Sequence, residues 1–269
     1  MTSNQPIGIF DSGMGGLTVA NAVRKLLPNE RIVYFGDSAH LPYGDKSAAA
    51  IQAYSVKICD VLLNEGCKVI LIACNSASAA AYELVKEYVG SKAHVLNVID
   101  PVINFLAEEY EQGPIGLIGT RQTVGSGVYA DKLSLRQPQL TLKALSTPLL
   151  VPMIEEGFHN NDISGPIIAN YLNDPLFDDI QALILGCTHY PLIKSHVEAF
   201  FTGSVNVIDS SLIVAEALQG LLRQHHLEAR KPAETQDRFL VSDFTPSFQA
   251  AAELFFQQRV SLEKHILWE

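Results

Sequence analysis

Short apolar runs alternate with amphipathic segments along the first part of the chain. The runs PIGIF (6–10), RIVYF (31–35) and KVILIA (68–73) are too short and too rich in β-favouring residues to be helices. The segments 17–27 and 47–66 carry apolar residues at helical spacing. This alternation predicts βαβ units with parallel strands, and such sheets bind ligands outside the carboxyl ends of their strands.

The pattern occurs twice. Three stretches recur in one order: PIGIFDS at 6 as PIGLIGT at 114, VILIACNS at 69 as ALILGCTH at 182, and NVID at 97 as NVID at 206. Because the offsets are nearly equal, we expect an α/β fold with two pseudo-symmetric lobes, each a mainly parallel sheet flanked by helices. The predicted lobes are 1–98 and 99–210, with 211–269 packing back on the first. Equivalent strand ends would then face one cleft between the lobes.

Composition and charge restrict the setting. The chain has 48% apolar and 18% charged residues, interspersed as in globular proteins, and no apolar run long enough to span a bilayer. Four cysteines without a C-x-x-C pair predict free thiols and a cytoplasmic location. A net charge of −10 argues against binding to a nucleic-acid backbone. A small-molecule substrate is the expected partner.

Two of the cysteines are candidates for chemistry. A single buried cysteine is usually a packing residue, and that interpretation holds for Cys59 and Cys67. The repeat, however, aligns Cys74 with Cys187. Both end a strand, both precede a hydrogen-bonding residue, and both are expected to precede a helix whose N-terminus favours a thiolate.

Paired thiols allow several chemistries. Zinc is weakly supported, because Cys187-Thr188-His189 lacks a second ligand pair, so no metal is predicted. A redox couple is possible but has no supporting feature. Cysteine acyl transfer would use His189 and leave Cys74 idle. Two equivalent groups on opposite faces of a carbon could instead remove and deliver a proton and so invert the centre.

The glycine-rich segment DSGMGGL (11–17) resembles a dinucleotide fingerprint only in part. Its third glycine would fall at Thr18, and Asp11 would repel a pyrophosphate. A tight turn explains the glycines without any ligand. We expect Asp11 and Ser12 to face the cleft, where Ser12 can hydrogen-bond substrate and Asp11 can bind an ammonium group or assist a thiol. No cofactor motif is visible, so no cofactor is predicted.

Four motifs occur in order along the chain: FDSGMGG (10–16), LPYG (41–44), ACNSASA (73–79) and LGCTHYPL (185–192). Together they closely resemble the motifs of the glutamate racemases, in the aspartate/glutamate racemase superfamily, and the resemblance covers most of the chain. It implies cofactor-independent interconversion of L- and D-glutamate, with D-glutamate supplied for peptidoglycan.

The resemblance also implies roles for individual residues. Cys74 and Cys187 would be the acid/base thiols, Asp11 would assist Cys74, and His189 backed by Glu155 would assist Cys187. The implied substrate-binding residues are Asp11, Ser12, Pro42, Tyr43, Gly44, Asn75, Ser76, Thr120, Thr123, Thr188 and His189. Ser76 stands where the family more often has threonine, and it keeps the hydroxyl.

Two other classes stay open on the sequence. A sister enzyme such as an aspartate racemase would share the thiols and differ in the pocket around the side-chain carboxylate. A non-catalytic binding protein could use the same architecture, although both thiols and their polar neighbours are retained. A homodimer is possible.

Overall fold

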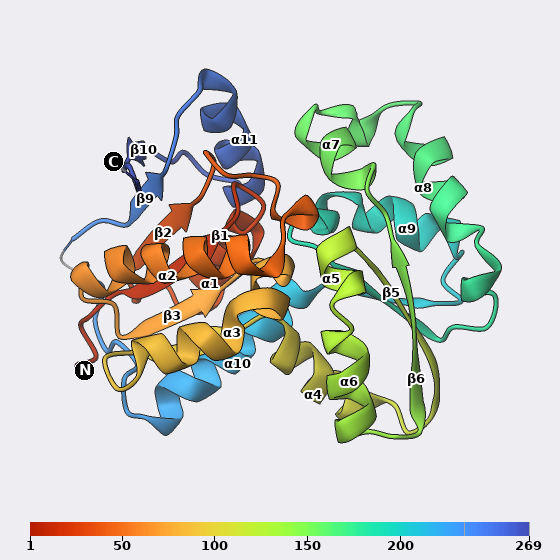
Figure 1. Cartoon of the computed structure of the whole chain (residues 1–269), viewed down its shortest axis with the longest axis horizontal. Helices are drawn as coiled ribbons and strands as arrows, with labels where there is room; N and C mark the ends of the chain where they lie inside the picture. The colour runs from red at the N-terminus through yellow and green to blue at the C-terminus, as the bar shows by residue number, and fades with distance from the viewer. Residues whose placement is uncertain (234, 269) are drawn as a thin grey trace.

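The computed structural model describes residues 1–233 and 235–268 and consists of two α/β lobes lying side by side (Figure 1). Within the described residues, the first lobe holds a six-stranded sheet in the order β10-β9-β2-β1-β3-β4. The second holds a four-stranded sheet in the order β6-β5-β7-β8. Every strand pairing is parallel, which confirms the predicted fold class.

The strands of the first sheet are β1 (Ile7–Asp11), β2 (Ile32–Gly36), β3 (Val69–Ile72), β4 (His94–Asn97), β9 (Arg238–Val241) and β10 (Leu262–Lys264). Those of the second are β5 (Gly113–Gly119), β6 (Leu140–Ser146), β7 (Ala182–Gly186) and β8 (Asn206–Ile208). The three strands predicted from apolar runs are β1, β2 and β3, each within a residue or two of its expected bounds.

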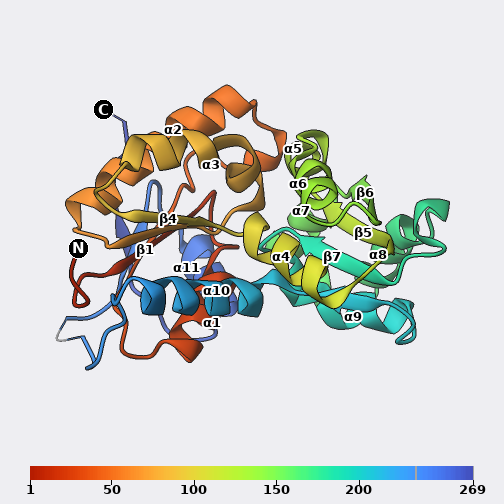
Figure 2. The same ribbon diagram turned by 90° about the horizontal axis from the view of Figure 1, so that it is seen from below.

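The α-helices are α1 (Leu17–Leu26), α2 (Ala48–Asn64), α3 (Asn75–Val89), α4 (Ile99–Glu109), α5 (Arg121–Gly125), α6 (Val128–Arg136), α7 (Leu150–Glu155), α8 (Ser164–Leu172), α9 (Lys194–Phe200), α10 (Ser210–Gln224) and α11 (Pro246–Phe256). Short 3₁₀ helices are η1 (Tyr43–Asp45), η2 (Phe158–Asn160), η3 (Pro175–Phe177) and η4 (Tyr190–Ile193). Seen from below, α2 and α3 cover one face of the first sheet, and α1 and α10 cover the other (Figure 2).

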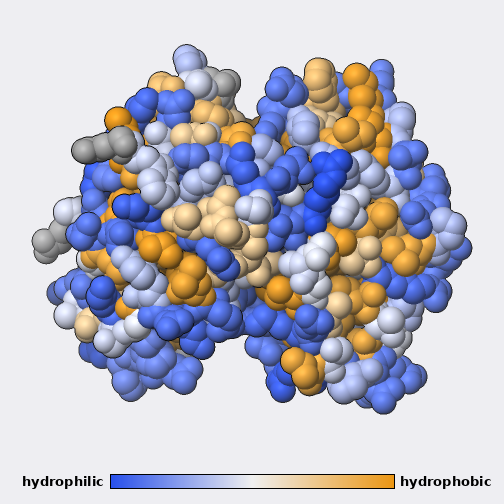
Figure 3. All heavy atoms as spheres, viewed as in Figure 1, coloured by the Kyte–Doolittle hydropathy of each residue, from blue (hydrophilic) through white to orange (hydrophobic). Residues whose placement is uncertain are grey.

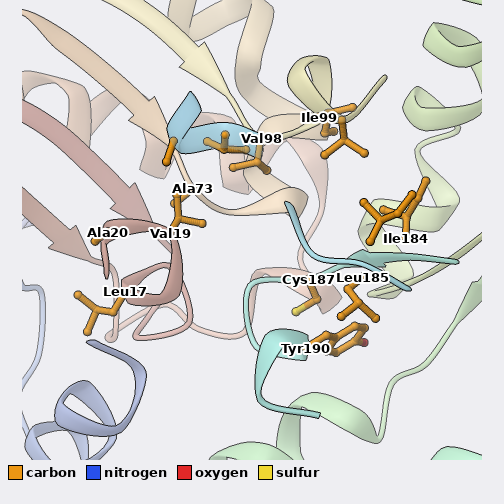
Figure 4. Packing of buried hydrophobic residues seen from close by; sticks show 14 of the residues in the cluster. Leu17, Val19, Ala20, Ala73, Val98, Ile99, Ile184, Leu185, Cys187 and Tyr190 are labelled. Carbon is orange, nitrogen blue, oxygen red and sulfur yellow. The ribbon is translucent and has the colours of Figure 1, made fainter. Parts of the chain in front are cut away.

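Burial on both faces explains the continuous apolar strands. In β1, Ile7 and Ile9 point into a core that continues through the second lobe, whereas Phe10 points into a second cluster under α2 and α3. Figure 4 shows part of the larger core where the two lobes meet. A parallel sheet covered by helices on both sides needs apolar residues at every strand position, so the sequence shows runs and not alternation.

The C-terminal segment adds strands to the first sheet. β9 pairs with β2, and β10 pairs with β9. Helix α10, which precedes them, packs on α1 and also on α4, near the junction of the lobes. Sheet membership does not by itself divide the helices between lobes, so the residue boundaries predicted above stay a prediction, and residues 234 and 269 lie outside the described part. Among described residues, no helix is long and apolar enough to cross a membrane.

Candidate active site

A cavity of about 280 Å³ opens between the two lobes, in the region where the surface is hollowed in Figure 3. Its walls come from the carboxyl ends of β1, β3, β5, β6 and β7, together with the η1 loop and α7. Twelve of the predicted site residues line it: Ser12, Pro42, Tyr43, Gly44, Cys74, Asn75, Ser76, Thr120, Glu155, Cys187, Thr188 and His189. The repeat had predicted this convergence of equivalent strand ends.

Cys74 is the N-cap of α3. It follows β3 after one residue, and its Sγ accepts a hydrogen bond from the backbone N–H of Ala77 at 3.4 Å. Ser12 Oγ lies 3.8 Å from the same sulfur. Burial is the largest influence on this thiol, and the charge of Asp11 adds to it, so the pKa of Cys74 is raised well above its ordinary value. Cys74 therefore carries its proton at neutral pH.

Cys187 follows β7 directly, and the helix expected after it is a short 3₁₀ helix that starts three residues later, so the Cys187 sulfur does not cap an α-helix as that of Cys74 does. The backbone continues through Thr188 and His189 into the 3₁₀ helix η4, and α9 begins only at Lys194. The sulfur lies beside the ring of Tyr190 (Figure 4).

His189 supplies the positive charge that a helix would otherwise provide. Its Nδ1 lies 3.8 Å from Cys187 Sγ, and its Nε2 lies 2.9 Å from Glu155 Oε1. Burial lowers the pKa of His189, but the hydrogen bonds to Cys187 and Glu155 outweigh it and raise the pKa to about 10. A protonated imidazole at this distance stabilises a negative charge on the Cys187 sulfur.

Asp11 does not line the cavity, contrary to the expectation that it faces the cleft. Its side chain is fully buried beneath the glycine-rich loop, where Oδ2 accepts hydrogen bonds from Gly13 N at 3.1 Å and Gly16 N at 3.0 Å. The carboxylate bonds to these two backbone N–H groups and does not turn toward the cleft, because leaving a buried N–H without a partner costs roughly 1–3 kcal/mol. The remaining oxygen, Oδ1, has no hydrogen-bond partner among the described residues.

The glycine at position 15 is required by close packing. A Cβ there would lie 2.4 Å from Thr188 Oγ1 and 2.5 Å from the His189 ring. The neighbouring Thr18 hydroxyl bonds the carbonyl oxygens of Gly15, at 2.9 Å, and of Thr188, at 3.0 Å. The β1–α1 loop of one lobe therefore rests directly on the histidine turn of the other, which explains the glycines without a nucleotide.

Hydroxyl groups from both lobes meet on one side of the cavity. Ser76 Oγ lies 2.8 Å from Thr120 Oγ1 and 3.3 Å from Thr123 Oγ1, and the two threonine hydroxyls are 3.1 Å apart. Thr123 is buried behind Thr120 and does not itself line the cavity. Asn75 accepts a hydrogen bond from Tyr129 OH at 2.7 Å, while its buried Nδ2 has no partner among the described residues. These are donors suited to carboxylate oxygens.

Several lining residues were missed by the sequence reasoning. They are Gly13, Leu41, Asp45, Arg121, Thr147, Pro148, Val151 and Pro152. Thr147 follows the end of β6 and its hydroxyl lies 2.7 Å from Tyr190 OH. The rule that points to Cys74, a polar residue at the carboxyl end of a parallel strand, would have found Thr147 had residues 140–146 been identified as a strand.

The other two cysteines lie in the core, as predicted. Burial is the main reason why the pKa values of Cys59 and Cys67 are each raised to about 12, so both are thiols. All four cysteines, which belong to the described part of the chain, are buried and unbridged. Within residues 1–233 and 235–268, no cluster of three or more histidine, cysteine or carboxylate side chains could hold a metal ion.

Comparison with known proteins finds racemases among those similar to this chain. A family model described as Asp/Glu/Hydantoin racemase matches residues 17–218. A glutamate racemase of Chlorobaculum parvum is 37% identical, over 95% of this chain and 93% of its own length. One of Neisseria meningitidis is 38% identical, over 93% and 92%. A crystal structure of the Francisella tularensis glutamate racemase in complex with D-glutamate superposes with a TM-score of 0.92 at 37% identity, covering 98% of each chain.

The two lobes and the cavity between them are thus those of a racemase acting on a small molecule, and the chain belongs to the Asp/Glu/Hydantoin racemase family. Within that family it is a member of the glutamate racemases, which are isomerases. The resemblance drawn from its motifs is confirmed.

Proposed function

We propose that the protein interconverts L- and D-glutamate by passing the α-proton between Cys74 and Cys187, without a cofactor. The observation that carries this proposal is that both thiols border one cavity from the ends of repeat-equivalent strands, β3 and β7. A substrate between them would present opposite faces of its α-carbon to the two sulfurs.

The cavity offers partners for a substrate with two carboxylates and an ammonium group. Ser76, Thr120 and the free Nδ2 of Asn75 can donate to carboxylate oxygens, and Thr188 lies on the Cys187 side. Its volume of about 280 Å³ is large enough for a small amino acid. The negative charge of the buried Asp11 carboxylate assists Cys74 as an acid by raising its pKa. Across the glycine-rich loop, the same charge can attract the ammonium group of the substrate.

The protonation states favour one starting arrangement. Cys74 holds its proton, and His189 is protonated and stabilises a thiolate on Cys187. The Cys187 thiolate takes the α-proton, so the Cα–H bond breaks, an S–H bond forms, and the electron pair moves into the carboxylate as an enolate. Cys74 then gives its proton to the opposite face of Cα, and its own S–H electron pair stays on sulfur.

The same site runs in reverse with the roles exchanged. After one inversion Cys187 is a thiol and Cys74 a thiolate, and this state accepts the product enantiomer. Proton exchange with solvent in the free enzyme restores the first state. Because each thiol's charge alters the other's ionisation, the pair titrates as one coupled system.

The proposal also covers the use of the product, the cellular location and the oligomeric state. The D-glutamate formed would feed peptidoglycan synthesis, as the resemblance to glutamate racemases implies. Four unbridged cysteines are typical of a reducing compartment, which supports a cytoplasmic location. A homodimer stays a prediction.

Solvent isotope incorporation tests the mechanism. In deuterated water, circular dichroism follows the loss of ellipticity as either enantiomer is racemised. Proton NMR follows the signal of the hydrogen on Cα. We expect deuterium at Cα of the product. Cys74→Ala and Cys187→Ala should each lower kcat by roughly 100-fold or more, the scale of a lost general acid or base, whereas Cys59→Ala should keep kcat. Inversion without deuterium uptake would rule out the two-thiol mechanism.

A parallel assay with D-aspartate separates the sister activity. Turnover of aspartate at a kcat/KM equal to or above that of glutamate would replace the substrate assignment while leaving the thiol chemistry in place.

A further inference from the structure

An ion pair crosses the mouth of the cavity. Arg121 begins α5 in the second lobe and Asp45 ends η1 in the first, and Nη1 lies 2.9 Å from Oδ1. Both residues line the cavity, yet neither belongs to the thiol, hydroxyl or histidine groups described above. Their side chains are 61% and 57% exposed. An exposed pair of this kind is weak and exchanges partners readily.

Arg121 is distinguished by its charge. Among the described residues that line the cavity it is the only lysine or arginine, and the carboxylates there are those of Asp45 and Glu155. The whole chain carries a net charge of −10. A dicarboxylate amino acid is itself an anion, so without Arg121 the potential at the mouth would oppose its approach.

The neighbours of Arg121 place it at the edge of the substrate donors. The preceding residue, Thr120, belongs to the hydroxyl cluster with Ser76. Gly44, which precedes Asp45, packs so tightly on Thr120 that a Cβ would lie 2.8 Å from the threonine Cβ. The loop and the start of α5 therefore pack closely together, and the cavity lining includes both the Thr120 hydroxyl and the neighbouring Arg121.

We infer that Arg121 is a substrate-recruiting residue that exchanges partners during turnover. Its guanidinium leaves Asp45 to bind a carboxylate of the incoming substrate, and Asp45 takes the guanidinium back when the product leaves. Asp45 thus competes with substrate, which keeps the cation from holding product too tightly. This inference rests on the proposed function, since it requires a substrate with a side-chain carboxylate, and it adds a specificity determinant to that site.

Four variants test it in the racemisation assay. Arg121→Gln should raise KM about three- to tenfold for both enantiomers with kcat within about twofold, because a recruiting cation acts on binding. Arg121→Lys should recover part of the loss. Asp45→Asn should lower KM by about two- to threefold, since the competing anion is gone. Arg223→Gln is the matched control: Arg223 is also 61% exposed and paired with a carboxylate, Glu228, but lies at the end of α10 away from the cavity.

The dependence of KM on ionic strength distinguishes a recruiting role from a purely structural one. KM of the unaltered protein should rise between low and moderate ionic strength as the attraction is screened, and the rise should be smaller in Arg121→Gln. The two enantiomers are equally stable in water, so kcat/KM must change equally in both directions in every variant, which checks the assay.

The possible outcomes distinguish a failure of the recruiting role from a failure of the proposed function. An unaltered salt response and KM in Arg121→Gln, or a raised KM in Asp45→Asn, would overturn the recruiting role while the racemase stands. If the unaltered protein does not racemise glutamate, the proposed function fails. Calorimetric binding of glutarate, a dicarboxylate without a stereocentre, to the unaltered protein and to Arg121→Gln would then decide the role of Arg121 by itself.

Discussion

At the scale of residues, two thiols related by an internal repeat have different surroundings. Cys74 caps a helix, and burial together with the charge of Asp11 raises its pKa and keeps it protonated. Cys187 has no α-helix behind it and is paired with a histidine whose pKa is raised to about 10. The two thiols therefore lie in different electrostatic surroundings before any substrate arrives.

Glu155→Gln tests this asymmetry. Glu155 raises the pKa of His189, so its loss should lower that pKa, and His189 would deprotonate at a lower pH. The alkaline fall of kcat/KM should move to lower pH, and kcat at pH 8 should drop by up to about tenfold, as for other groups that act through a neighbour. The pH profile of kcat/KM is the measurement. Glu156→Gln, at the adjacent exposed position, should leave the profile in place.

At the scale of elements, the β1–α1 loop joins the lobes. Asp11 fixes it through two backbone N–H groups, and Thr18 bonds the carbonyl of Thr188 in the opposite lobe. The loop thus sets the position of the turn that carries Thr188 and His189. A glycine-rich sequence that resembles a nucleotide motif serves here as a packing surface.

Gly15→Ala should damage catalysis more than stability of the fold. Its Cβ would push against Thr188 and His189, and a displacement of about 1 Å near the reacting groups can lower kcat by roughly 100-fold. Far-ultraviolet circular dichroism should stay unchanged. Gly220→Ala is the matched control, because nothing lies within 4 Å of its added Cβ and the change should stabilise α10 by about 0.5–1 kcal/mol. Equal kcat in both variants would contradict this role for the loop.

At the scale of the molecule, a buried ion pair ties the N-terminal residues and the segment after α10 to the first sheet. Lys68, which is fully buried, donates to Ser3 O at 2.6 Å, Glu30 Oε2 at 2.6 Å and Leu227 O at 2.9 Å. The second oxygen of Glu30 accepts from Ala229 N at 2.7 Å. One ammonium group therefore organises the N-terminal residues, the start of β3 and the segment after α10.

Lys68→Met should lower the free energy of unfolding by about 3–5 kcal/mol, because it leaves the Glu30 carboxylate buried without its partner. Denaturant titration measures the loss. Adding Glu30→Gln should restore part of it, and Lys231→Met, at an exposed position, should change stability little. A Lys68→Met protein as stable as the unaltered one would show that the pair contributes nothing net.

The local features of the protein follow from its sequence alone. Strand and helix periods are set by each residue's own backbone and side-chain direction, so β1, β2, β3, α1 and α2 could be predicted. The repeat brought Cys74 and Cys187 to equivalent strand ends, and the motifs around them indicated the family. Each of these signals is read directly from the order of residues along the chain and needs no knowledge of contacts in space.

The orientation of individual side chains and the contacts between distant segments were decided only by the tertiary structure. Asp11 does not face the cleft because its carboxylate accepts hydrogen bonds from backbone N–H groups of its own loop. The type of helix that follows Cys187 was decided in the same way, since the 3₁₀ helix η4 precedes α9 there. Arg121 meets Asp45 across 76 positions, a pairing that no local pattern encodes, because the packing of two lobes brings the residues together.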